Sequence, residues 1–90
     1  MIRAIDVKAL PDFKLRLKFN DGTEGIVDLS RLKNGEAFKC WQEPGNFEKV
    51  YIDGEGIAWN KDLDIDAFSA YLEITGQSFE QFAAKQKDYA

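Results

Sequence analysis

One stretch of the chain, residues 13–29, alternates apolar and polar side chains on both sides of an Asn20-Asp21-Gly22 turn signal. Strict alternation is typical of a strand with one buried face, and an Asp-Gly pair between two such runs is typical of a hairpin turn. The stretch therefore predicts a β-hairpin whose two strands run from about 13 to 19 and from about 23 to 29. Hairpins host unrelated functions, so this feature constrains the architecture and leaves the activity open.

The alignment of the two strands follows from which side chains it would bury. A two-residue turn would place Asp28 beside Leu15 on the buried face, and burying an unpaired charge is costly. A three-residue loop, with Gly22 in the left-handed conformation, instead pairs Leu15 with Val27. We predict the second register, which also places Gly25 where a large neighbouring side chain can cover it.

The same register places a basic stripe on the face turned to water, formed by Lys14, Arg16 and Lys18 and shared with Ile26 and Asp28. A basic strand face can contact nucleic acid, but no aromatic side chain interleaves with this one to stack bases. We interpret it as an outward face whose charges discourage aggregation, and keep nucleic-acid contact as the alternative.

The remaining segments predict further short elements. They are a first strand over 2–10 that ends at Pro11, a helical turn over 36–41, a second hairpin from strands at 47–52 and 56–59, and a helix over 67–74 that stops at Gly76. Phe79 and Phe82 have helical spacing and lie in or after the run Ser78-Phe79-Glu80-Gln81, which fits the capping-box pattern and predicts a last helix. The fold class is α+β: a small antiparallel β-meander of about five strands with two hairpins, covered by two or three short helices. Residues 1–76 form one domain, and 77–90 form a helical appendage of it.

Composition limits the class of protein. Ninety residues suffice for one domain, and 44% apolar with 13% aromatic residues indicates a folded core. The net charge is −4, with a mildly basic first third and an acidic remainder. A single cysteine, Cys40, with no secretory signal and no apolar run of about 20 residues, predicts a cytoplasmic protein without a membrane span.

The chemical groups do not form a recognisable catalytic set. The chain has no histidine, which removes the commonest general base and most transition-metal sites. Asp62, Asp64 and Asp66 alternate as in a calcium loop, but Ala67 replaces the glycine that such a loop needs. We interpret these carboxylates as a solvated segment in which Asp64 or Asp66 caps the helix that follows. We predict no enzyme, no cofactor, no metal and no small-molecule substrate.

A family resemblance rests on the spacing of turn and apolar signals. The run 17–23, then Val27-Asp28-Leu29-Ser30, Phe38, Phe47, a hairpin ending in Trp59, and Asp62-Leu63 resemble the small bacterial family catalogued as domain of unknown function 2442. The resemblance covers roughly residues 1–72 and departs after Trp59, where members often have proline and this chain has Asn60. It implies a small N-terminal-domain-like α/β fold with no established activity, often beside proteins of suspected toxin–antitoxin type.

Two functions are consistent with these features. The first is a protein-interaction or regulatory, antitoxin-like module that uses a sheet edge or the apolar side of its last helix, with Phe79 and Phe82 as contacts. The alternative is a nucleic-acid-associated transcriptional regulator that uses Lys14, Arg16 and Lys18. Free sheet edges and an aromatic tail also predict a homodimer.

Overall fold

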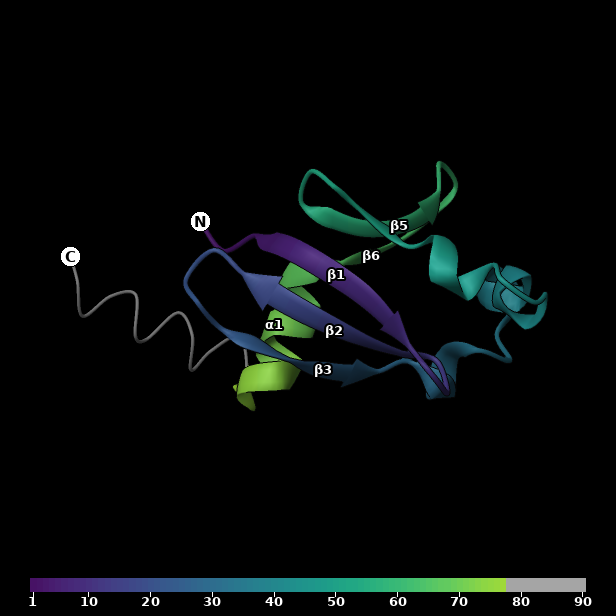
Figure 1. Cartoon of the computed structure of the whole chain (residues 1–90), viewed down its shortest axis with the longest axis horizontal. Helices are drawn as coiled ribbons and strands as arrows, with labels where there is room; N and C mark the ends of the chain where they lie inside the picture. The colour runs from purple at the N-terminus through teal and green to yellow at the C-terminus, as the bar shows by residue number, and fades with distance from the viewer. Residues whose placement is uncertain (78–90) are drawn as a thin grey trace.

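The computed structural model describes residues 1–77, which form two antiparallel three-stranded sheets, one α-helix and three short 3₁₀ segments (Figure 1). The α+β class is therefore confirmed. The sheets are not one meander of about five strands, because a sixth strand completes a second sheet. The helix predicted beyond Gly76, with Phe79 and Phe82, lies outside the described residues.

The first sheet contains β1 (Ala4–Leu10), β2 (Lys14–Phe19) and β3 (Glu24–Asp28) in sequence order. Leu15 pairs with Val27, as the three-residue loop requires. Gly22 has a φ of 90°, and its N–H donates to the Phe19 carbonyl at 3.0 Å. The predicted register is thus confirmed, and a shift of one residue from it would turn Glu24 and Asp28 toward the core.

The second sheet contains β4 (Tyr51–Asp53), β5 (Gly56–Asn60) and β6 (Leu63–Asp66). The predicted hairpin is present, but the predicted strand over 47–52 is wrong in its first half. Phe47–Lys49 forms a 3₁₀ turn, and the Phe47 carbonyl accepts a hydrogen bond from Trp59 Nε1 at 2.9 Å. A buried indole N–H needs a partner, and this turn brings the carbonyl to it.

Strand β6 was expected to be a solvated acidic segment. Its alternation is real, since Leu63 is buried and Ile65 half-buried while Asp64 and Asp66 are exposed. Four residues are too few for alternation to separate a strand from a loop when half of them are aspartates, which are depleted in strands.

Helix α1 (Ala67–Thr75) follows β6 directly. The Asp66 carboxylate accepts hydrogen bonds from the backbone N–H groups of Phe68 and Ser69, and Gly76 ends the helix at a φ of 69°. Both ends agree with the predicted cap and stop. The helical turn predicted over 36–41 is a 3₁₀ segment, Glu36–Gln42.

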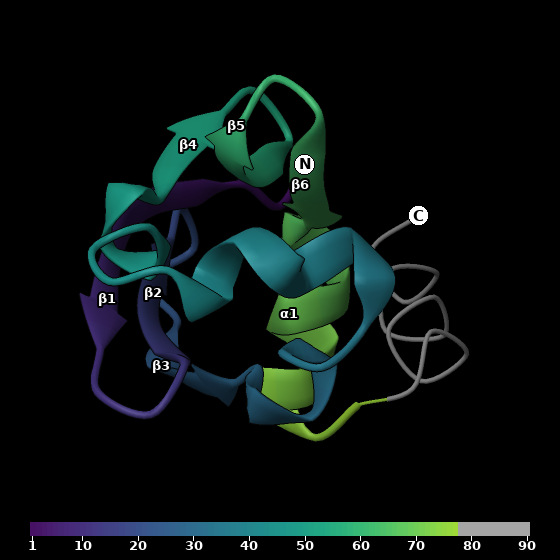
Figure 2. The same cartoon turned by 90° about the vertical axis from the view of Figure 1, so that its right-hand side faces the viewer.

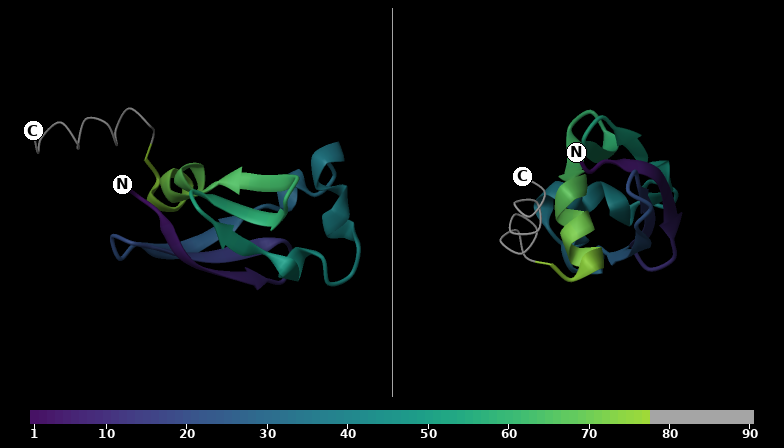
Figure 3. Two further views of the ribbon diagram at one scale, coloured as in Figure 1. Left: turned by 90° about the horizontal axis from the view of Figure 1, so that it is seen from above. Right: turned by 90° about the vertical axis from the view of Figure 1, so that its left-hand side faces the viewer.

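The two sheets enclose the core, and α1 lies across the opening between β3 and β6 (Figure 2). Helix α1 and the segment Glu36–Gln42 lie toward opposite ends of the molecule (Figure 3). An aromatic cluster packs at the second end, formed by Phe13, Phe38, Trp41, Phe47 and Trp59. Within residues 1–77, no helix is long and apolar enough to cross a membrane.

Candidate interaction surface

The outward face of the first sheet is organised in cross-strand rows, because side chains on one face of paired strands line up. The rows from β1 through β2 to β3 are Asp6, Lys18 and Glu24; Lys8, Arg16 and Ile26; and Leu10, Lys14 and Asp28. The basic stripe on β2 is therefore bordered by carboxylates on both neighbouring strands.

Two of these neighbours interact directly with the stripe. Arg16 forms an ion pair with Glu24. The pKa of Asp28 lies below its usual value, mainly because its carboxylate accepts hydrogen bonds from the Ser30 hydroxyl and the Ser30 backbone N–H. The nearby charge of Lys14 lowers this pKa further. The charges of Arg16 and Lys14 are thus partly balanced within the protein.

Strand β3 forms an edge of the first sheet. The Leu29 N–H donates to the Phe13 carbonyl at 2.8 Å. In an antiparallel pair, every second residue forms backbone hydrogen bonds to the neighbouring strand. The odd-numbered residues of β3 therefore bond to β2. The N–H and C=O groups of Glu24, Ile26 and Asp28 therefore point away from β2. Within residues 1–77, no other strand pairs with this edge.

An apolar side chain stands at the middle of this edge. Ile26 is 58% exposed and lies between two charged residues of the same strand, Glu24 and Asp28. By contrast, β1, at the other side of the sheet, lies beside β4 (Figure 2). Backbone groups without a strand partner, together with an exposed branched side chain, are the features that a strand-binding edge requires.

The edge ends at Asp28. Arg31 Nη1 donates to the Asp28 carbonyl at 2.8 Å and lies 3.2 Å from Glu73 Oε1 on α1. This contact occupies the last outward carbonyl of β3, so a pairing segment can extend from Glu24 to the Asp28 N–H and no further along the strand.

The turn at the other end of the hairpin is tied to α1. The Tyr71 hydroxyl donates to Asp21 Oδ2 at 2.7 Å, and Thr23 N–H donates to Asp21 Oδ1 at 2.9 Å. Burial raises the pKa of the Asp21 carboxyl, but these hydrogen bonds outweigh it and the net pKa is lowered. Asp21 therefore has a structural role.

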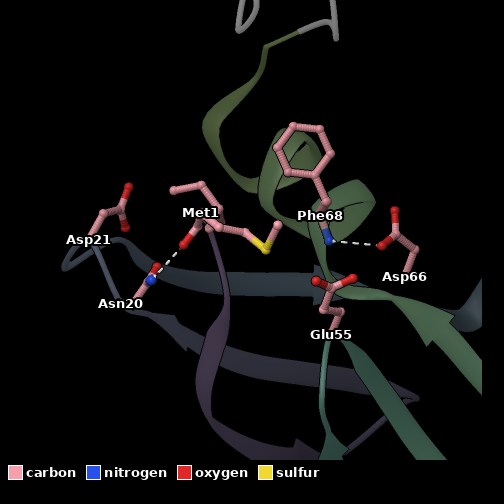
Figure 4. Close-up of a pocket in the computed structure, with 7 residues that line it drawn as sticks. Met1, Asn20, Asp21, Glu55, Asp66 and Phe68 are labelled. Atoms are coloured by element: carbon pink, nitrogen blue, oxygen red, sulfur yellow. Dashed lines mark hydrogen bonds between the residues drawn. The ribbon is translucent and has the colours of Figure 1, made fainter. Parts of the chain in front are cut away.

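A cavity of about 550 Å³ opens beside this turn, and its lining includes Asp21, Glu55, Asp66, Phe68 and Met1 (Figure 4). Asp66 caps α1, and Asp21 accepts from Tyr71. Two of the three carboxylates thus hold the fold together, and within residues 1–77 no cluster of metal-ligating side chains is present.

The predicted residues separate into two groups. Lys14, Arg16 and Lys18 share the outward face as expected, and Asp28 lies beside them. Among the residues predicted to form a structural motif, Val27, Leu29 and Trp59 are buried, and Asp21 and Gly22 form the turn. Phe79 and Phe82 lie outside the described residues.

Sequence reasoning did not select Glu24 and Ile26 as interaction residues. A signal was present, because the register placed an isoleucine on a face otherwise lined by charged side chains. That β3 is an edge strand depends on which segments pair with it, and this is a property of the tertiary structure.

Comparison with known proteins gives one match. A family model described as "Protein of unknown function (DUF2442)" matches residues 4–76. No curated protein and no solved structure matches the chain significantly. The match extends from the start of β1 to the glycine that ends α1, and the chain belongs to the DUF2442 family.

Proposed function

We propose that this protein is a cytoplasmic, non-catalytic interaction module, regulatory and antitoxin-like in role, that binds an extended segment of a partner protein along β3. The observation that supports it best is the edge itself: the backbone groups of Glu24 and Ile26 point away from the sheet beside an exposed Ile26 side chain. A partner strand placed there would continue the first sheet.

The affinity expected from such an edge is modest. Each backbone hydrogen bond contributes about 0.5–1.5 kcal/mol net, so five bonds, two each from Glu24 and Ile26 and one from the Asp28 N–H, contribute roughly 2.5–7.5 kcal/mol. Ordering a flexible partner segment opposes this gain. The contact is therefore weak and reversible, which suits regulation.

The nucleic-acid alternative has less support. Its basic stripe has Lys8 as well as Asp6 beside it on β1, faces Glu24 and Asp28 on β3, and has Arg16 paired with Glu24. Phosphate binding needs cations that are free to replace counterions. The outward face is a mixed-charge surface, which is more typical of contact with another protein.

The test compares two substitutions of one residue. Because the Ile26 N–H points away from β2, Ile26→Pro removes a donor from the free edge and leaves the bonds to β2 in place. The matched control, Ile26→Thr, keeps the N–H and a β-branched side chain.

Peptides selected from a random displayed library on the full chain are titrated against all three proteins, with circular dichroism to show that each is folded. We expect binding to the wild type and to the threonine variant, and a loss of at least about fivefold with proline, because the partner's acceptor is left unpaired. Equal binding to the proline variant would rule out β3 as the docking edge.

A further inference from the structure

We infer that the partner strand carries a basic, an apolar and a second basic side chain at alternate positions, facing Glu24, Ile26 and Asp28 respectively. This inference rests on the proposed strand addition at β3 and specifies its partner. Because the pattern reads the same in both directions, it holds for parallel and antiparallel addition.

The charge order across the sheet carries the inference. The first row runs from Asp6 through Lys18 to Glu24, so its charges alternate and end on a carboxylate at the open edge. Opposite charges on neighbouring strands stabilise a sheet, and like charges placed opposite each other destabilise it. A further strand continues this row with a cation.

The other two rows lead to the same pattern. One passes through Lys14 and ends on Asp28, which again requires a cation in the next strand. The middle row, in which Lys8 lies opposite Arg16, ends on Ile26, which is 58% exposed and would be covered by an apolar or β-branched side chain. Together the three rows specify a basic, apolar, basic order.

A second copy of this chain does not fit this edge. In antiparallel pairing, the outward-pointing residues of one β3 must align with those of the other, namely Glu24, Ile26 and Asp28. Every such alignment places a carboxylate opposite either another carboxylate or Ile26. The chain therefore carries a built-in obstacle to self-pairing along β3, and the occupant is a different protein.

The length of the occupant is also defined. Arg31 donates to the Asp28 carbonyl, so backbone pairing stops at Asp28. At the other end, β3 begins at Glu24, next to the three-residue turn. The recognised segment thus extends from the basic residue that faces Glu24 to the basic residue that faces Asp28.

The experiment titrates the full chain with two capped peptides, Thr-Lys-Thr-Val-Thr-Lys-Thr and Thr-Glu-Thr-Val-Thr-Glu-Thr, and follows the backbone amide signals of β3 by NMR. An exposed ion pair changes affinity by about two- to fivefold, so two pairs favour the lysine peptide by roughly four- to twenty-fivefold. That preference should shrink when salt is raised to about 0.5 M.

A charge-neutralising variant tests whether the preference for the lysine peptide arises from the carboxylates of β3. Glu24→Gln removes one of the two carboxylates and should reduce the preference by about two- to fivefold. Glu55→Gln makes the same chemical change at an exposed residue between β4 and β5, so it should leave the preference unchanged.

The outcomes separate this inference from the proposed function. If both peptides bind equally at the β3 amides, the charge pattern is wrong while strand addition stands. The same holds if the only peptides that bind β3 are library-selected ones without the basic pattern. If no peptide shifts the β3 amides, strand addition itself is wrong. A concentration-dependent dimer that Ile26→Pro abolishes would overturn the inference by showing that a second copy occupies the edge.

Discussion

Single residues explain why α1 can close against the first sheet. Gly25 on β3 faces Ile74 of α1, and a Cβ built on Gly25 would lie 2.5 Å from Ile74 Cγ2. Two carbon atoms cannot approach so closely, so glycine is required here for packing. Gly25 is opposite Leu17, as predicted, and the large side chain expected to cover it is Ile74.

Gly25→Ala should therefore destabilise the protein. Forcing an extra methyl group into a packed interface costs about 1–3 kcal/mol, which chemical denaturation of the purified variant would measure. A double-mutant cycle provides the control, because the cost should fall in an Ile74→Ala background where the methyl group has room. An unchanged cost in that background would mean that the loss has another origin.

At the scale of elements, local signals succeed where side chains and backbone cooperate within a few residues. Asp66 ends β6 and starts α1, because its carboxylate accepts from Phe68 N–H, Ser69 N–H and the Ser69 hydroxyl. The helix and its start were predictable for that reason. The strand before it was not, because β6 exists only through its pairing with β5.

Asp66→Ala should reduce the free energy of unfolding by about 0.5–2 kcal/mol, the usual range for loss of an N-cap. Asp64→Ala, at an exposed aspartate two residues earlier on β6, is the matched control and should change it by less than about 0.5 kcal/mol. Thermal unfolding followed by circular dichroism compares the two. Equal losses would show that charge, and not capping, is responsible.

For the whole molecule, one hydrogen bond joins parts of the chain that are 50 residues apart: Tyr71 on α1 donates to Asp21 in the β2–β3 turn. The pKa of Asp21 is lowered below 3.8 and that of Tyr71 is raised above 10.0. Asp21 therefore adds stability above its unfolded-state pKa and loses it as pH falls through its lower folded pKa. Tyr71 adds stability below 10.0 and loses it as pH rises through its raised pKa.

Tyr71→Phe should consequently destabilise the protein by about 1 kcal/mol near neutral pH. The difference from wild type should shrink in acid, once Asp21 is protonated, and again in strong alkali. Denaturant midpoints measured across the pH range test this. The Asp21→Asn variant is the control: in this background, the stability lost on Tyr71→Phe should not change in acid. If the stability lost on Tyr71→Phe in the wild-type background does not depend on pH, the assignment is wrong.

The sequence by itself determined the features that depend on neighbours in the chain. The alternation through Leu15 and Val27 and the Gly22 turn set the register of the first hairpin. A cap at Asp64 or Asp66 and the Gly76 stop set the helix, and the structure selects Asp66. Such features follow from local geometry and from the cost of burying a charge, so they can be derived without knowing the fold.

The tertiary structure alone decided the features that depend on distant partners. Phe47 became part of a turn because its carbonyl meets the Trp59 indole, and β6 became a strand because β5 pairs with it. The candidate site belongs to this group. Lys14, Arg16 and Lys18 could be placed on one face from the sequence, but the open edge at Ile26 arises because, within residues 1–77, no other strand pairs with β3.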